Sequence, residues 1–599
     1  MNIEDRLNSL RGFMKERNLS AYIIPTDDFH GSEYVGEYFK AREFMSGFTG
    51  SAGTLIVLSD EAALWTDGRY FIQAADQLKD SSIVLMRSGQ PGVPEMAEYL
   101  HEHLEEKSII GFDGRTVTER FAQTIAKKTD EKHITFDGSE DLVNLVWAQR
   151  PPISAEPVRE VDVKYTGLSR EEKLQCVRDK MRDEKADVLL LTALDEIAWL
   201  TNLRGDDVQY TPVFMAYMLL TLDKAQLFIH EQILPDEIRH KLTQAGIVTA
   251  PYDEIEQAVG NIANGSRVWS DSGKVNYRLQ HILTERAEVI DKRSPIELMK
   301  AVKTKQEADC IRAAHVKDGV AVTRFMHWLK TRADKEKITE MSAAAKLESF
   351  RAQEEGYLGP SFESIIAYGA HGAIVHYEPT EQTDVEIVSG SLCLADTGGH
   401  YREGTTDVTR TFALGKVSEE EKKYYTIVLR GHLALGAARF PQGVCGQNLD
   451  VLARGPLWEA GLDYNHGTGH GVGFILNVHE GPQRFHWRIS EQTQCVPLEE
   501  GMVISNEPGI YLEGRFGIRH ENLVLCRKQE ETEYGQFMYL EPLTMVPFDR
   551  DAIVPELMSD RELQWLNDYH RRVYETLSPY FAGDELAWLR EVTAELNRR

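Results

Sequence analysis

The hydrophobic and polar positions of the chain follow one order twice, near its start and again some 165 residues later. Each copy predicts an amphipathic helix, a buried strand, a turn with aromatic and glycine residues, and a hairpin. We therefore expect two α/β domains of similar fold. The segments of the first copy are a helix with Leu7, Leu10 and Met14, then AYIIPTDD at 21–28, FMSGFTG at 44–50 and LIVLSDEAALWTD at 55–67, and those of the second are KLQCVRDKMRDEK at 173–185, ADVLLLTALDE at 186–196, WLTNLRG at 199–205 and MLLTLDKAQLFI at 218–229.

Two turn-forming segments predict the domain boundaries. RPPISAEPVRE at 150–160 separates the two copies, because its three prolines disfavour both helix and sheet. KRSPIE at 292–297 precedes a third region with a different pattern. The predicted domains are 1–155, 156–297 and 298–599.

The third region begins with helical patterns and ends with one. Leu298 to Leu329 has the apolar spacing of a helix, and Thr339 is placed to cap another helix that runs to about Gln353. Short strands and glycine turns follow. Near the end of the chain a stripe recurs every four residues and predicts a helix packed on the core. It consists of Trp565, Tyr569, Val573 and Leu577.

Composition and charge narrow the function classes. Hydrophobic residues make up 42% and charged residues 27% of the 599 residues, as in ordinary folded proteins. The net charge of −28 repels nucleic acid and anionic lipid headgroups, so we expect no nucleic-acid partner and no membrane association. The N-terminal segment is charged and lacks the apolar run of a signal peptide, and no run of 18 apolar residues occurs. We expect a cytoplasmic protein.

Six cysteines are scattered along the chain without CxxC spacing. This pattern favours reduced, mostly buried thiols over a zinc site or a disulfide framework. They are Cys176, Cys310, Cys393, Cys445, Cys495 and Cys526.

Four acidic residues occupy equivalent places in two predicted hairpins of the third region. Asp396 closes the strand SLCLAD, and Asp407 lies in the strand TTDVTRTF after a glycine-rich turn. Glu507 ends the strand MVISNE, and Glu521 follows the turn GIYLEGRFG. Clustered buried acids are costly unless cations neutralise them. The pattern predicts either a metal site or four separately solvated acids.

Three histidines, His466, His470 and His479, are interleaved with small residues in HGTGHGVGFILNVHEGP at 466–482, between the two hairpins. One histidine with four carboxylates suits two divalent ions, and favours Mn²⁺ over structural zinc. The sequence contains no GxxxxGK[ST], HExxH or GxSxG motif. Metal-assisted hydrolysis is the chemistry that this pattern favours.

The segments that hold these residues closely resemble those of the aminopeptidase P (Xaa-Pro aminopeptidase) family, in its long, three-domain cytosolic form. The matching segments are LADTGGHYREGTTDVTRT, HGTGHGVGFILNVHEGP, NEPGIY and FGIRHEN, with further matches such as PTDDFHGSEY and NLRGDDVQYTPVF across almost the whole chain. The resemblance implies two creatinase-type N-terminal domains and a pita-bread metallopeptidase domain. It also implies hydrolysis of the N-terminal Xaa-Pro bond of peptides by a hydroxide bridging two metal ions.

The resemblance assigns the metal ligands residue by residue. It implies that Asp396 and Asp407 hold one ion, that His470 and Glu507 hold the other, and that Asp407 and Glu521 bridge both. The ions it implies are two divalent cations per chain, best matched by Mn²⁺.

The resemblance also assigns the catalytic and substrate-binding residues. Glu507 is implied as the general base. His376 and His479 are implied to bind the scissile carbonyl region, and His466 to contact the substrate around the proline. Arg519 is implied to hydrogen-bond into the carboxylate network. His520 departs from the family pattern, and strand alternation predicts that its side chain points away from the metals.

Two other functions remain open at this point. Prolidase, which cleaves Xaa-Pro dipeptides, uses the same ligands, but prolidase-like chains have one N-terminal domain rather than two. A non-enzymatic binding protein on this fold is disfavoured because all five implied ligands are present. Family analogy also implies a homodimer formed through the third domain.

Overall fold

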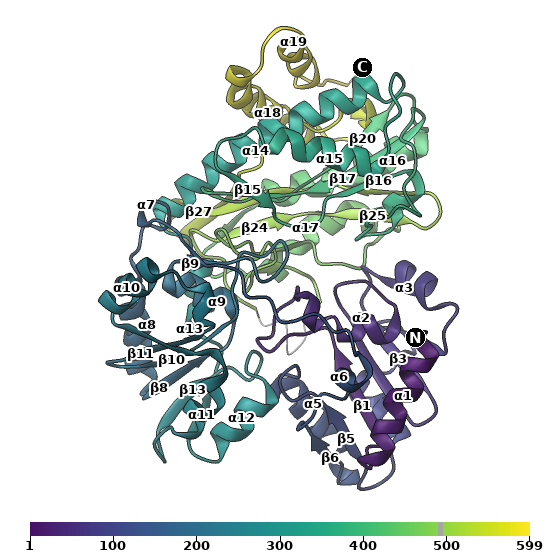
Figure 1. Ribbon diagram of the computed structural model, residues 1–599. Coiled ribbons are helices and arrows are strands. Elements are labelled where there is room, and N and C mark those ends of the chain that lie inside the picture. Colours follow the sequence, from purple (N-terminus) through teal and green to yellow (C-terminus); the bar gives the residue numbers. More distant parts are fainter. Residues whose placement is uncertain (489–494, 599) are drawn as a thin grey trace. The chain divides into compact units, whose positions relative to one another are not determined.

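The computed structural model describes residues 1–488 and 495–598 (Figure 1). These residues form two compact units. The first unit holds residues 1–163 and 168–297, and the second holds residues 164–167 and 298–599. Within the described residues, no helix combines the length and the apolarity that crossing a bilayer requires.

The first unit contains two six-stranded sheets with the same strand order, β4-β3-β2-β1-β5-β6 and β12-β11-β10-β8-β13-β14. In each sheet the second, third and fourth strands of this order pair antiparallel, and all other neighbours pair parallel. The duplication predicted from the sequence is therefore confirmed. The strands are β1 (Ala21–Pro25), β2 (Thr54–Leu58), β3 (Ala62–Thr66), β4 (Ile83–Arg87), β5 (Ile109–Phe112) and β6 (Thr135–Asp137), and then β8 (Val188–Leu191), β10 (Ala216–Thr221), β11 (Ala225–Ile229), β12 (Ile247–Pro251), β13 (Arg267–Ser270) and β14 (Glu288–Asp291).

Equivalent helices precede the two sheets. Helices α1 (Ile3–Glu16) and α8 (Arg170–Glu184) bury one apolar stripe each, and that of α1 is the predicted Leu7, Leu10 and Met14. The segments predicted as turns are the ends of short helices. Helices α2 (Ala41–Ser46) and α9 (Leu194–Thr201) are followed by Gly47 and Asn202, whose φ angles of 76° and 52° lie in the left-handed region that stops a helix.

The two sheets of the first unit are joined by backbone hydrogen bonds at equivalent helix starts. Thr118 caps α5 (Glu119–Thr129) and Asn276 caps α12 (Tyr277–Thr284), and the two caps form a β-bridge. The amide of Tyr277 donates to the Val117 carbonyl at 2.8 Å. The junction is therefore built from the same position of both copies.

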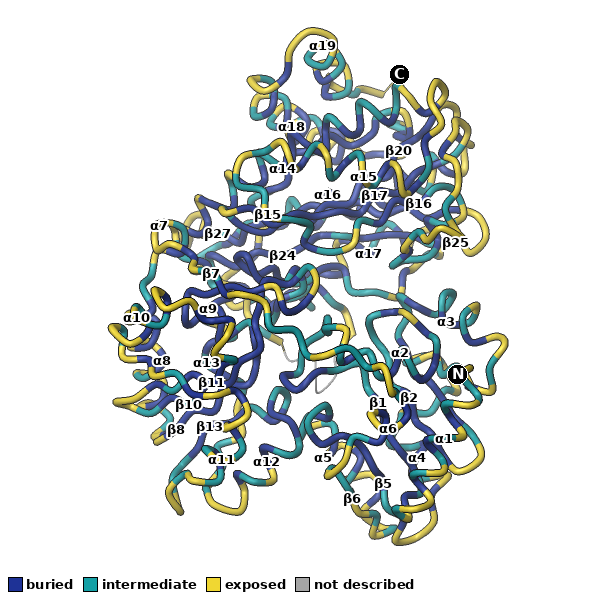
Figure 2. Tube along the Cα trace, viewed as in Figure 1, coloured by how far each residue is buried: buried dark blue, intermediate teal, exposed yellow. Residues whose placement is uncertain are grey.

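The second unit is made of antiparallel hairpins wrapped by helices (Figures 1 and 2). Its two larger sheets have the orders β16-β17-β20 and β21-β28-β27-β24. Three small sheets, β15-β18-β19, β22-β23 and β25-β26, complete it. The strands are β15 (Tyr357–Pro360), β16 (Ile365–Tyr368), β17 (Ser391–Thr397), β18 (Gly399–Tyr401), β19 (Gly404–Thr405), β20 (Val408–Leu414), β21 (Arg439–Pro441), β22 (Gly469–His470), β23 (Arg484–Phe485), β24 (Val503–Asn506), β25 (Gly509–Leu512), β26 (Phe516–Arg519), β27 (Asn522–Thr532) and β28 (Gly535–Pro542).

The prediction of one long helix over 298–329 is wrong in one respect, because the helix is interrupted at residues 302–304. Helix α13 ends at Ala301, and Thr304 starts α14 by a capping box with Glu307. Val302 is instead drawn into a β-bridge with Met502. The α-helices from residue 295 onward are α13 (Pro295–Ala301), α14 (Lys305–Arg332), α15 (Glu340–Arg351), α16 (Glu419–Gly436), α17 (Gly446–Glu459), α18 (Asp560–Leu577) and α19 (Gly583–Val592).

Two other helix predictions for this region are confirmed. Thr339 caps α15, and the helix ends at Arg351, within two residues of the predicted end. In α18, Tyr569, Val573 and Leu577 are buried in the core, and Trp565 packs against it from a partly buried position. The C-terminal stripe is therefore part of the core of this unit.

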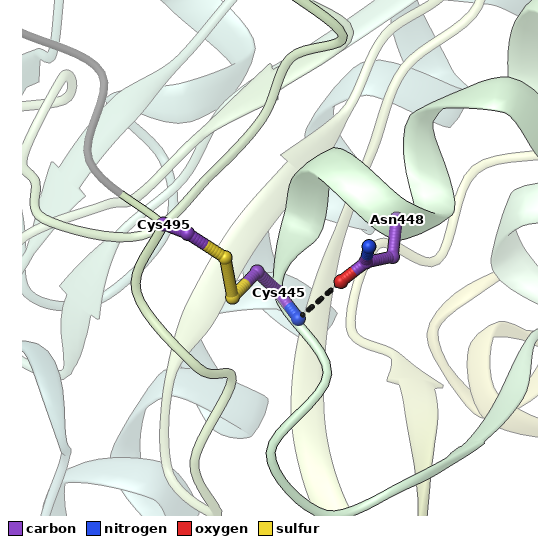
Figure 3. Close-up of a disulfide and its surroundings, with 3 residues drawn as sticks. All are labelled: Cys445, Asn448 and Cys495. Carbon is purple, nitrogen blue, oxygen red and sulfur yellow. Dashed lines mark hydrogen bonds between the residues drawn. A yellow bond between two sulfur atoms is a disulfide. The ribbon is translucent and has the colours of Figure 1, made fainter. Parts of the chain in front are cut away.

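The prediction that all six cysteines are free thiols is wrong. Cys445 and Cys495 form a disulfide, with their Cα atoms 5.8 Å apart (Figure 3). The two residues are 50 positions apart in sequence and meet because Cys445 forms a β-bridge with Pro497. Such a tertiary pairing has no spacing signature. Cys310, Cys393 and Cys526 are buried free thiols, and Cys176 is an exposed one.

Opening the disulfide should destabilise the second unit. Closing a 50-residue loop restricts the unfolded chain, so Cys445→Ser should lower the free energy of unfolding by about 2–4 kcal/mol. The measurement is urea unfolding without reductant. Cys495→Ser and the double variant should lose the same amount, since all three lack the same bond. A Cys445→Ser protein as stable as the oxidised wild type would contradict the structure.

Candidate metal centre

The first acidic pair lies on one face of the β17–β20 hairpin. Asp396 is paired in register with Thr409, and Asp407 lies two residues before Thr409. Side chains alternate along a strand, so Asp396, Asp407 and Thr409 share one face. Asp396 and Asp407 are 8% and 4% exposed, so both carboxylates are buried.

The second acidic pair lies at the matching end of β24 and β27. Asn506 pairs with Asn522, so Glu507 and Glu521 are the next residues across the same ladder. Thr409 connects this hairpin to the first one. Its hydroxyl donates to Glu521 Oε2 at 2.9 Å, and its carbonyl accepts from the Glu521 amide at 3.1 Å.

His470 reaches both acidic pairs from the short strand β22. Its Nε2 atom lies 3.4 Å from Asp407 Oδ2 and 3.4 Å from Glu507 Oε1. Its Nδ1–H donates to the Gly471 carbonyl at 2.9 Å, which leaves Nε2 as the lone-pair nitrogen when the ring is neutral.

Two glycines on either side of His470 allow the backbone to pass this close. A Cβ atom at Gly469 would lie 1.8 Å from the Ser505 carbonyl oxygen, and one at Gly471 would lie 2.0 Å from the Glu480 carbonyl oxygen. Gly469 and Gly471 are therefore required by packing rather than by phosphate binding.

The raised pKa values in the cluster indicate an excess of negative charge that a cation would neutralise. Burial raises the pKa of Asp396 to about 6, although Arg519 opposes the shift. Burial and the neighbouring acids hold the pKa of Glu521 well above its usual range. Burial lowers the pKa of His470, but hydrogen bonding to Asp407 and the charge of Glu507 outweigh it and give a pKa of about 9. Each shift reflects excess negative charge with little water.

The donor set fits divalent cations. One ligand atom each of Asp407, His470 and Glu521 lies within 4.8 Å of the others. Asp396 Oδ1 is buried and accepts no hydrogen bond from the described residues, which leaves a lone pair available. Oxygen ligands with a single imidazole match Mn²⁺ or a similar ion.

A hydrogen-bond chain connects the centre to His466. Arg519 donates to Asp396 Oδ2 at 2.5 Å and to the Tyr511 hydroxyl at 2.7 Å. Tyr511 is within 2.8 Å of His466 Nε2, while Nδ1 of that ring donates to the Gly467 carbonyl. Sequence reasoning placed Arg519 in the carboxylate network but gave Tyr511 no role, although it lies in the NEPGIY segment.

The three histidines implied to bind substrate lie near the cluster or near the hydrogen bonds that connect Asp396 with His466. The ring centroid of His479 is 4.3 Å from that of His470. His376 is half-buried in a turn whose Val375 carbonyl accepts from Arg519 at 3.3 Å. The roles of His376, His466 and His479 stay predictions.

His520 points away from the acidic face, as alternation predicts. Its ring is buried against Tyr425 and Phe548, and its Nε2 atom is 3.3 Å from the Tyr425 carbonyl.

Arg410 is a buried residue at this site that sequence reasoning missed. Its guanidinium donates to the carbonyls of Thr409 and Glu521 and so fastens β20 to β27 beside a candidate ligand. Its other acceptors among the described residues are also carbonyl, amide or hydroxyl oxygens. Alternation places Arg410 on the face opposite the acids, where the sequence gives no signal of a role.

Family models match the chain in four consecutive segments. The first two segments, 6–146 and 149–307, match the Creatinase/Prolidase N-terminal domain. Residues 309–528 match Metallopeptidase family M24, and residues 536–596 match the C-terminal region of peptidase M24. All the candidate ligands fall in the M24 segment.

Full-length relatives agree with this assignment. A probable Xaa-Pro aminopeptidase P from Laccaria bicolor is 40% identical, covering 100% of this chain and 94% of that protein. Aminopeptidase P2 from Arabidopsis thaliana is 39% identical, covering 97% and 87%. The crystal structure of X-prolyl aminopeptidase from Caenorhabditis elegans, described as a cytosolic enzyme with a di-nuclear active site, has a TM-score of 0.95, with 33% identity and full coverage of both chains.

Removing the single imidazole from the cluster should impair metal binding without unfolding the chain. We expect His470→Ala to lose bound Mn²⁺ and to lower kcat by about 100-fold or more, because even partners of metal ligands cost 10- to 100-fold. Metal analysis and steady-state kinetics check this. His486→Ala, which removes a ring bonded to the Arg488 carbonyl, is the matched control. Normal metal content and activity in His470→Ala would contradict its assignment as a ligand.

Metal binding should release protons. The raised pKa values of Asp396, Glu521 and His470 mean that the metal-free folded chain holds protons that a cation must displace. Raising the pH from about 5 to about 8 should therefore strengthen Mn²⁺ binding. Calorimetry in two buffers of different ionisation enthalpy measures the release, and Asp396→Asn should release less. Equal apparent enthalpies in both buffers would contradict these shifts.

Proposed function

This chain belongs to the aminopeptidase P family of M24 metallopeptidases, and we propose that it removes the N-terminal residue from peptides that carry proline in the second position. The observation that supports the proposal is the meeting of four carboxylates and one imidazole in a single cluster of the M24 segment, in which Asp396, Asp407 and Glu521 are buried. A non-enzymatic protein on this fold would have no need of that costly arrangement.

Two Mn²⁺ ions are proposed as the cofactor. Asp396 and Asp407 would hold one ion, His470 and Glu507 the other, and Asp407 and Glu521 would bridge them. When bound there, divalent ions polarise a carbonyl and lower the pKa of a bound water.

Glu507 is the proposed general base and acid. Its side chain is 17% exposed, against 11% for Asp396 and 5% for Asp407, so water and substrate reach it most easily among these carboxylates. The Ser505 hydroxyl donates to Glu507 Oε1 at 3.0 Å and fixes its orientation. A proton that Glu507 takes from water can then pass to the imino nitrogen of the leaving proline.

The histidines are proposed to bind the peptide. His376 and His479 would donate to the scissile carbonyl region, where negative charge develops in the transition state. His466 would contact the substrate around the proline. Its ring is held at both nitrogens, by the Gly467 carbonyl and the Tyr511 hydroxyl, so its orientation is set before substrate arrives.

We propose that two copies associate through helix α17, which exposes large apolar side chains. The Trp458 and Trp487 rings lie 6.2 Å apart in an edge-to-face pair. Val451, Leu452, Trp458 and Trp487 are 48%, 37%, 42% and 42% exposed. Light scattering should find dimers for the wild type and monomers for Trp458→Lys; monomeric wild type would contradict the proposal.

A cytoplasmic location is also proposed, supported by the C. elegans relative described as cytosolic. Disulfides are uncommon in that compartment, so the Cys445–Cys495 pair would there be in exchange with cellular thiols.

Substrate choice tests the proposed activity. With Mn²⁺, arginine should be released from Arg-Pro-Pro and not from Arg-Ala-Ala, and a chelator should abolish the release. The dipeptide Arg-Pro serves as the matched comparison, since a prolidase would prefer it. No metal-dependent release from any of the three peptides would contradict an aminopeptidase.

A further inference from the structure

A buried ion pair on helix α17 lies under the segment that carries His466. Asp450 and Arg454 are one helical turn apart, and Arg454 Nε donates to Asp450 Oδ2 at 2.8 Å. Their side chains are 0% and 1% exposed. Burying both charges costs desolvation free energy that the attraction between them does not offset by itself. The other hydrogen bonds of these two side chains must therefore explain why the pair is buried.

The remaining donors of Arg454 are directed to the loop that follows α17. Nη1 donates to the Tyr464 carbonyl at 2.8 Å and to Asp463 Oδ1 at 2.6 Å. Nη2 donates to the His466 carbonyl at 2.8 Å. The guanidinium also stacks on the Tyr464 ring, 3.8 Å from its centroid. A planar guanidinium fork sends these hydrogen bonds in fixed directions at the same time, a geometry that the ammonium of a lysine does not reproduce.

Asp450 holds the end of the same loop. Its Oδ1 atom accepts from the Thr468 hydroxyl at 2.5 Å, and the Thr468 carbonyl accepts from the Glu507 amide at 2.9 Å. The loop between Asp463 and Thr468 is therefore wrapped around Arg454 and fastened at both ends. Tyr464 is buried in the core, while Asp463 and Asn465 are exposed, so this loop has one apolar anchor and depends on Arg454 and Asp450 for the rest of its support.

We propose that Arg454, held by Asp450, is a positioning residue that sets His466 against the proline side of the substrate. The inference rests on the proposed function. The His466 ring is bonded to the Gly467 carbonyl and to Tyr511, so a shift of the 464–466 backbone breaks the alignment of the ring with Tyr511. Arg454 acts through the backbone of His466, and Asp450 acts by holding Arg454 in place.

The alternative is that the pair only stabilises the unit, and a double-mutant cycle separates the two roles. Arg454→Met removes all the donors, and Arg454→Lys keeps the charge beside Asp450 but loses the fork. Each is combined with His466→Ala. Arg439→Met, which removes an exposed arginine paired with Glu530, is the matched control.

The measured quantities are kcat and KM on Arg-Pro-Pro, metal content, and the Kd of the product Pro-Pro by calorimetry. We expect Arg454→Lys and Arg454→Met to lower kcat/KM and weaken Pro-Pro binding by about 10- to 100-fold, with Mn²⁺ content unchanged. In the His466→Ala background the same substitutions should have almost no further effect. If Arg454→Met does not fold, the double-mutant cycle is completed with Arg454→Lys. If His466→Ala is too slow for kinetics, the cycle is completed with the Kd values for Pro-Pro.

Each other outcome overturns the proposal. Equal losses with and without His466 would show that Arg454 does not act through that ring. Unchanged kcat/KM in a folded Arg454→Lys protein would show that the fork is not needed. The proposed function fails separately, if wild-type protein with Mn²⁺ does not cleave Arg-Pro-Pro at all.

Discussion

Mutual repulsion among four clustered carboxylates, three of them buried, is the constraint on which the second unit depends. Asp396, Asp407, Glu507 and Glu521 face one another at the ends of two hairpins, with little water to screen them. Bound cations would relieve that repulsion, and the surrounding residues supply hydrogen bonds and positive charge. Arg519 supplies the nearest positive charge, to Asp396, and Thr409 supplies a hydroxyl to Glu521. Stability and chemistry therefore come from the same arrangement.

Strand register brings the two acids of each pair together. In each hairpin the register sets the two acids on one face, and Thr409 connects the hairpins on that face. Arg410 fastens the same strands from the opposite face. The imidazole enters through a segment whose glycines let β22 lie against its neighbours. The M24 match over 309–528 covers all of these elements.

The sequence predicted the features that follow from local periodicity. Alternation revealed the hairpins and their acids, and helical spacing revealed α1, α15 and α18. The missed features depend on partners far along the chain. Val302 leaves a helical pattern to pair with Met502, and Cys445 meets Cys495 across 50 residues. Arg410 and Arg454 bond to backbone carbonyls of distant segments, and Tyr511 bonds to the distant His466 ring, contacts that no spacing encodes.

Asp396, Asp407, His470, Glu507 and Glu521 are proposed to form one dinuclear centre. Anomalous X-ray scattering from crystals grown with Mn²⁺ locates the ions. We expect two anomalous peaks in the second unit, one beside Asp396 and Asp407 and the other beside His470 and Glu507, with Glu521 and Asp407 between them. A single peak, or two peaks held by other residues, would contradict it.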